Sequence, residues 1–110
     1  MTFFPELIAR HPAVDLGREE VESHPFQAGD QQFVFMSYQR DTDIPEHSHA
    51  AQWGVVLEGE MELTVEGERR LLRRGDSYIL PAGAQHSARI HRGYKGLTMF
   101  DQKDRYTPGQ

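Results

Sequence analysis

The sequence contains no cysteine, which excludes both a disulfide framework and a thiolate metal site. It also lacks any run near the roughly 20 apolar residues that a membrane-spanning helix needs. The N-terminus has no basic leader followed by an apolar run and a small-residue cleavage site, so it does not resemble a secretory signal. These absences favour a cytoplasmic protein that does not bind a membrane.

Basic residues are too few, and too mixed with acids, to form a nucleic-acid-binding face. The chain has 12 lysines and arginines against 17 aspartates and glutamates, for a net charge of −5. Its densest basic stretch, residues 69–74, lies between acidic residues and suits a solvated hairpin. Because binding to phosphates needs a continuous basic surface, we predict no nucleic-acid partner.

The 110 residues suit a single domain. Residues 1–31 predict an irregular arm that packs on this domain, with room for one edge strand. Within the arm, Pro5 favours the start of a short helix at Glu6–Arg10. Residues 32–110 predict a barrel.

From residue 32 onward, short apolar or alternating segments are separated by turn residues. Glu60–Val65 alternates cleanly, whereas Gln52–Leu57 is apolar on both faces, as in a strand covered on both sides. We expect a turn at Asp41–Pro45 and a tight hairpin turn around Gly67. Further strands are predicted at Gln32–Arg40, Arg69–Arg73, Ser77–Leu80, Gln85–His91 and Lys95–Phe100.

No long segment has helical periodicity, so the pattern indicates an all-β sandwich or closed barrel. We expect its core to include large apolar and aromatic side chains, namely Tyr38, Trp53, Met61, Tyr78 and Phe100.

Six histidines supply the nitrogen ligands for a metal site. His47 and His49 stand two apart, and residues two apart on a strand point to the same face. A bend at the two alanines that follow would bring Gln52 to that face, and His86 begins a separate strand. Three imidazoles and one amide oxygen suit a transition metal (Mn, Fe, Co, Ni, Cu or Zn) better than Mg or Ca.

The remaining histidines are expected to have no part in this site. His91 is an odd number of residues from His86 and should face outward. His11 and His24 lie in the arm, where surface positions are expected.

The spacing of the histidines resembles the first of two sequence motifs of the cupin superfamily. That motif is a glycine, five residues, His-x-His, three or four residues, a glutamate, six residues and a glycine. Here His47, His49 and Gly59 match, and Gln52 stands where the glutamate would fall. Asp41 replaces the leading glycine, and only two residues separate His49 from Gln52.

The second cupin motif is a glycine, five residues, Pro-x-Gly, two residues, a histidine, three residues and an asparagine. Gly75, Pro81, Gly83 and His86 match it at every spacing, and Ile90 replaces the asparagine, which is not a ligand. The resemblance covers roughly residues 32–100 and is to small single-domain cupins with Gln in the glutamate position.

The resemblance implies a jelly-roll β-barrel, or double-stranded β-helix, with one divalent transition metal at its centre. His47, His49, Gln52 and His86 would be the ligands. A neutral amide in place of a carboxylate leaves the site with the full charge of the ion, which favours an anionic ligand and weakens metal retention.

Three functions are compatible with such a barrel. The first is a metal-dependent enzyme, such as a dioxygenase, isomerase or lyase, acting on a small oxygenated or anionic molecule. The second is a binding or sensing module that holds a small molecule in the same pocket without chemistry. The third is a barrel that survives without metal. No convincing general base is present, and Tyr38 and Tyr78 are candidates only by residue type.

The outer face of the Gln52–Leu57 strand carries Trp53, Val55 and Leu57. A monomer should not leave such a face exposed, so either the arm covers it or a second copy does. The cupin resemblance favours a homodimer.

Overall fold

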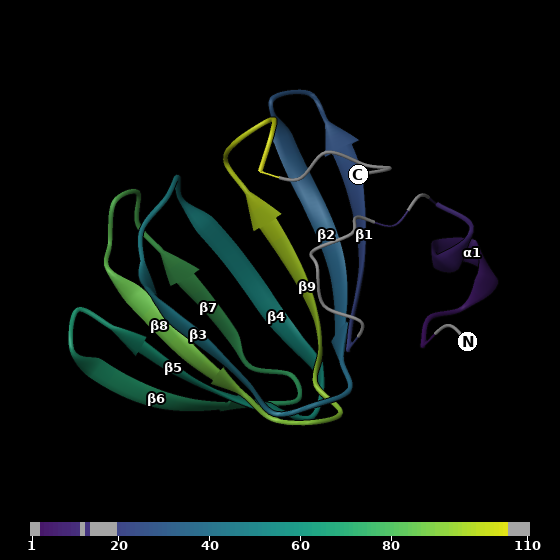
Figure 1. Cartoon of the computed structure of the whole chain (residues 1–110). Helices are drawn as coiled ribbons and strands as arrows, with labels where there is room; N and C mark the ends of the chain where they lie inside the picture. Colours follow the sequence, from purple (N-terminus) through teal and green to yellow (C-terminus); the bar gives the residue numbers. More distant parts are fainter. Residues whose placement is uncertain (1–2, 12, 14–19, 106–110) are drawn as a thin grey trace.

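The computed structural model describes residues 3–11, 13 and 20–105. Within these ranges a short helix, α1 (Glu6–Ala9), precedes the strands (Figure 1). The strands are β1 (Val21–Ala28), β2 (Gln31–Tyr38), β3 (Thr42–His47), β4 (Gln52–Glu58), β5 (Glu60–Val65), β6 (Glu68–Arg73), β7 (Ser77–Leu80), β8 (His86–Ile90) and β9 (Lys95–Phe100). No helix in the described ranges has the length and apolar character needed to span a membrane.

The strands form two antiparallel sheets that face each other across one core (Figure 1). One sheet has the order β1-β2-β9-β4-β7, and the other has the order β3-β8-β5-β6. The chain therefore crosses between sheets repeatedly, which is the topology of a jelly roll. The predicted all-β jelly-roll barrel is confirmed.

The core forms from alternate residues of facing strands. Met61 and Leu63 of β5 are buried, as their alternation with polar residues predicts, and Val56 of β4 and Val34 of β2 meet them from the other sheet. Each such side chain contributes about 1.5–3 kcal/mol by leaving water. Trp53 does not belong to this core, contrary to the prediction, because its neighbours Gln52 and Gly54 occupy the inner face; its side chain is 37% exposed.

The turn predicted at Asp41–Pro45 is wrong, because Thr42–His47 forms β3. Among the described strands, β3 lies at the edge of its sheet and pairs with β8 alone. Its register with β8 shifts between Ile44 and His47, so Pro45 falls in an irregularity. An edge strand with a bulge is the setting in which a sheet tolerates a proline.

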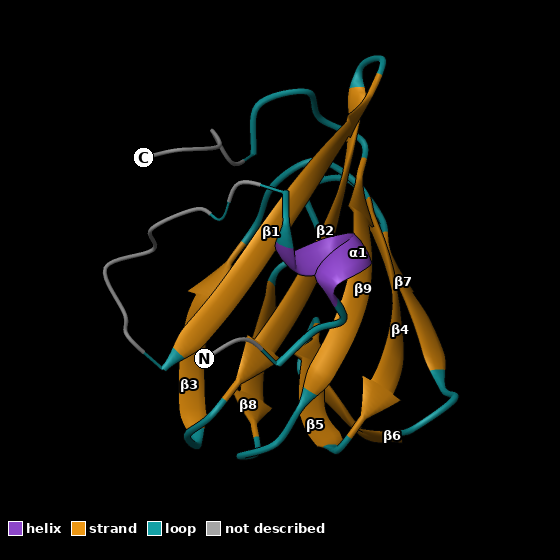
Figure 2. Ribbon diagram, turned by 90° about the vertical axis from the view of Figure 1, so that its right-hand side faces the viewer, coloured by secondary structure: helices purple, strands orange, loops and turns teal. Residues whose placement is uncertain are grey.

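The N-terminal segment packs on the outer side of the five-stranded sheet, with α1 lying across it (Figure 2). β1 is an edge strand, paired along its whole length with β2. The arm expected over residues 1–31 includes residues 1–2, 12 and 14–19, which lie outside the described ranges, and its boundary with the barrel stays a prediction.

His24 of β1 is buried, although a surface position was expected, and only 4% of it is exposed. Its Nε2 lies 2.5 Å from a Glu22 carboxylate oxygen, and its Nδ1 lies 2.9 Å from the carbonyl oxygen of His11. Glu22 also accepts a hydrogen bond from the backbone N–H of Phe3. His24 thus links the sheet to the N-terminal segment that covers it.

Candidate metal centre

Three histidines meet at one end of the barrel interior. His47 ends β3 and His86 begins β8, and the two residues are directly paired across these strands. His49 lies in the connection that follows β3. Their ring centroids are 4.3 Å (His47–His86), 4.7 Å (His49–His86) and 5.2 Å (His47–His49) apart, and one ring nitrogen of each lies within 4.8 Å of the others.

Each of these imidazoles has its Nδ1 against a backbone carbonyl oxygen. The distances are 2.8 Å from His47 to Pro45, 2.7 Å from His49 to Ala50 and 3.0 Å from His86 to Ala84. A carbonyl only accepts hydrogen bonds, so Nδ1 must carry the proton. In the neutral ring Nε2 then holds the lone pair, and the outer hydrogen bond orients it as for a metal ligand.

Burial favours the neutral form of two of the rings. Removal from water lowers the pKa of His49 and of His86, the hydrogen bonds to the carbonyls of Ala50 and Ala84 oppose this shift in part, and the electrostatic influence of Arg105 and His47 lowers the pKa of both rings further. Metal ligands must be deprotonated, so a lowered pKa prepares these rings for an ion at neutral pH.

The histidine trio has the chemistry and the spacing to coordinate a transition metal. Two imidazole nitrogens on one ion lie at most about 4.2 Å apart, given metal–nitrogen bonds of about 2.0–2.1 Å. Nitrogens already within 4.8 Å of one another need only small side-chain rotations to reach that range. Imidazole nitrogens are donors of intermediate softness, so three of them suit the predicted transition metals better than Mg or Ca.

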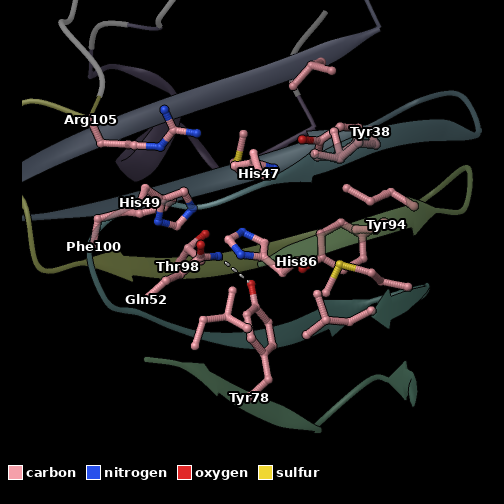
Figure 3. Close-up of a pocket in the computed structure, with 18 residues that line it drawn as sticks. Tyr38, His47, His49, Gln52, Tyr78, His86, Tyr94, Thr98, Phe100 and Arg105 are labelled. Atoms are coloured by element: carbon pink, nitrogen blue, oxygen red, sulfur yellow. Dashed lines mark hydrogen bonds between the residues drawn. The ribbon is translucent and has the colours of Figure 1, made fainter. Parts of the chain in front are cut away.

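Gln52, the first residue of β4, lies beside the histidines (Figure 3). Its Nε2 donates a hydrogen bond of 3.0 Å to the hydroxyl of Tyr78. This contact directs the amide nitrogen toward the tyrosine, which leaves the amide oxygen as the atom available to a metal. Coordination by Gln52 stays a prediction.

Gly54 makes room for the Tyr78 ring. A Cβ at this position would lie 2.6 Å from Cε1 of Tyr78 and still closer to Cζ and the hydroxyl oxygen. The ring therefore lies against the bare backbone of β4, and the missing side chain at Gly54 sets the position of the hydroxyl that holds Gln52.

The histidines open into a cavity of about 280 Å³ between the sheets. Tyr38 and Tyr78, the tyrosines considered as bases, both line it. Arg105 lines it too, with its guanidinium carbon 5.6 Å from the centroid of Phe100. Sequence reasoning missed Arg105, because it follows the last strand in a polar segment that carries no motif.

His91, which was expected to take no part in the site, lies elsewhere. His91 hydrogen-bonds Glu62 at 2.8 Å outside the barrel, so the prediction that it faces outward is confirmed. Glu46, the neighbour of His47, is exposed.

The fold and the site together define a two-sheet β-barrel with a histidine trio at one end of its interior. The cupin domain family matches residues 34–101. The chain belongs to this family, as the sequence motifs predicted.

One curated relative and two solved structures indicate the range of similar proteins. The chain is 35% identical over 74 residues to quercetin 2,3-dioxygenase of Bacillus subtilis (strain 168), a match that covers 66% of this chain and 22% of that protein. KdgF from Halomonas sp. superposes with a TM-score of 0.75 at 24% identity, over 94% of this chain and 96% of that one. An RmlC-like cupin from Shewanella frigidimarina NCIMB 400 has a TM-score of 0.78 at 20% identity, over 96% and 94%. The two structures show likeness of fold alone.

Proposed function

We propose that the chain is a metal-dependent enzyme acting on a small oxygenated molecule. His47, His49, His86 and Gln52 would hold one divalent transition metal. The observation that carries the proposal is the orientation of the three imidazoles. Their Nδ1–H groups are tied to backbone carbonyls, so their lone pairs are left for an ion at the end of a cavity.

The bound ion would supply a Lewis acid with open positions for a substrate oxygen or for dioxygen. The protein would do the rest. The histidines orient the site, the apolar walls exclude water, and Arg105 places a positive charge at the cavity that favours an anionic substrate.

Among the three enzyme classes, dioxygenation has the most support. Isomerases and lyases commonly need a general base, and no aspartate or glutamate is among the described residues that line the cavity. A dioxygenase places both oxygen atoms in its products and needs no other oxidant. The similarity to quercetin 2,3-dioxygenase supports this class, although the match covers less than a quarter of that protein.

The alternative is a non-catalytic module that binds or senses a small molecule through the same metal. The absence of a carboxylate from the described cavity lining favours it as well, because binding needs no proton acceptor. A neutral Gln52 would leave charge on the ion to hold an anion.

We also propose that two copies associate as a homodimer through the outer face of β4 and β7. Trp53 pairs directly with Ile79 across these strands, and their side chains are 37% and 72% exposed. The described N-terminal segment packs on the same outer face but over its β1–β2 end (Figure 2). The β4–β7 end is therefore left for a partner copy. The cytoplasmic location proposed for the chain rests on the sequence only.

Metal reconstitution followed by oxygen consumption tests the enzymatic proposal. Purified protein is loaded separately with Fe, Mn, Ni, Co, Cu and Zn, and dioxygen uptake is recorded with quercetin, smaller 1,3-diketones and ortho-diphenols. Uptake that requires a redox-active metal and disappears in His49→Ala supports the enzyme. Stoichiometric metal with tight ligand binding but no turnover supports the binding module.

A further inference from the structure

The cavity has two chemically different ends. Figure 3 shows Arg105, His49 and Gln52 at one end and Tyr38 and Tyr94 at the other. We call these the metal end and the tyrosine end. A ligand that fills the whole cavity meets charge and polar donors at the metal end and mainly carbon at the tyrosine end.

The length of the cavity can be estimated from β8, because residues at both ends of this strand line it. His86 and Ile90 stand at opposite ends of this strand, and both line the cavity. Four residues of extended chain rise about 13 Å at roughly 3.3 Å per residue. Met61 lies directly across from Ile90 in the neighbouring strand, so the tyrosine end continues the apolar core.

Formal charge is confined to the metal end. Arg105 is the one aspartate, glutamate, lysine or arginine among the described lining residues. Its guanidinium lies over Phe100, and Phe100 in turn packs edge-on against His49 with ring centroids 5.5 Å apart. The arginine therefore lies at the metal end, close to the predicted ligands.

The tyrosine end suits an aromatic or other apolar group. The Tyr38 and Tyr94 rings lie edge to face, with centroids 6.0 Å apart, and both are buried. Aromatic rings favour this arrangement with a further ring, because ring edges are positive and ring faces are negative. An apolar cavity of about 150 Å³ holds benzene, so the 280 Å³ here holds one ring with a short acidic side chain.

We propose that the ligand is an amphipathic monoanion. Its carboxylate or enolate head binds at the metal end with Arg105, and its aromatic or aliphatic body lies against Tyr38, Met61 and Tyr94. This inference rests on the proposed metal centre and names the substrate class for it. A polyhydroxylated acid of the same charge is a poor fit, because its hydroxyl groups would be buried against Met61 and Ile90.

Calorimetry on the zinc-loaded protein tests the inference with three matched probes. Zinc allows binding to be measured without redox turnover. The probes are 3-phenylpropionate, its neutral isostere 3-phenylpropionamide, and D-glucuronate as an acid with a hydrophilic body. We expect 3-phenylpropionate to bind at least about tenfold more tightly than either of the others. Glucuronate binding as tightly as 3-phenylpropionate, or the amide doing so, would overturn the proposal.

Two variants assign the ends of the ligand. Arg105→Gln should weaken 3-phenylpropionate by about tenfold and leave the amide unchanged, whereas Arg74→Gln on the outer surface should change neither. Ile44→Thr makes the half-buried wall of the cavity more polar and should weaken both phenyl probes but not acetate. Equal effects of Arg105→Gln on the acid and the amide would contradict the assignment of the head.

Zinc content, measured before each titration, distinguishes failure of the proposed metal centre from failure of the proposed ligand class. Protein that takes up no zinc refutes the metal centre on which the inference rests. Protein that holds zinc but prefers glucuronate keeps the metal centre and refutes the amphipathic ligand.

Discussion

Gly54→Ala is the substitution whose effect the structure defines most sharply. The new Cβ would lie 2.6 Å from Cε1 of Tyr78 and closer still to its Cζ and hydroxyl oxygen. The ring would have to move by at least about 0.9 Å to reach the roughly 3.5 Å separation that carbon atoms favour. Tyr78 is only 7% exposed, so it has little space for that movement.

The expected loss of stability is the sum of two effects. Overpacking of a core costs about 1–3 kcal/mol. Displacement of Tyr78 also breaks its hydrogen bond with Gln52, which adds about 0.5–1.5 kcal/mol. We therefore expect Gly54→Ala to lower the free energy of unfolding by about 1.5–4.5 kcal/mol, measured by urea denaturation.

The same substitution in a Tyr78→Leu background provides the control. Leucine lacks the ring atoms that a Cβ at position 54 would meet, and it cannot bond Gln52. In that background Gly54→Ala should cost less than about 0.5 kcal/mol, because the interaction that makes the pair non-additive is gone. An equal cost in both backgrounds would refute the explanation of Gly54 as the space for Tyr78.

Four further outcomes are expected. Gln52→Glu should bind metal more tightly, by at least about tenfold in competition with a chelator, because a carboxylate offsets the charge of the ion; unchanged affinity would mean that residue 52 does not coordinate. Metal binding should be steady at neutral pH and weaken only at pH values under the ordinary histidine pKa of about 6.5, because burial lowers the pKa of His49 and His86 and protonation of either removes a ligand; binding that strengthens on acidification would contradict this. His24→Ala should lower the free energy of unfolding by about 1–3 kcal/mol through the loss of its buried hydrogen bonds and leave metal affinity intact; a change in metal affinity would show coupling that the structure does not contain. Trp53→Ser should shift the protein from dimer to monomer in light scattering, whereas the control Leu71→Ser, an exposed apolar residue of the other sheet, should not; a wild-type monomer would refute the dimer.

Most of the barrel could be predicted because its strands alternate in two-residue periods. Met61 and Leu63 alternate with polar residues, and the structure buries both. β3 was missed because Pro45 signals a turn locally, and only the edge position and the bulge make it compatible with a strand. That compatibility depends on the neighbouring strand β8, which local sequence does not reveal.

The histidine trio was predictable for a different reason. His47 and His49 were expected to share a face of one strand; the structure ends β3 at His47 and places His49 in the connection, where the two rings still meet. The cupin spacing added His86 from far along the chain. The positions of Arg105 and Tyr78 were harder to predict from the sequence, because they depend on how the last segment and β7 pack. The burial of His24 was unpredictable in the same way, since the segment that covers it is separate in sequence.

The central claim is that the histidine trio holds one metal ion, and elemental analysis after metal reconstitution tests it most directly. The wild-type chain should retain close to one transition-metal ion per chain, and His49→Ala should lose it while keeping its far-ultraviolet circular dichroism. A folded wild-type chain that retains no metal after reconstitution, or a His49→Ala variant that retains it fully, would contradict the claim.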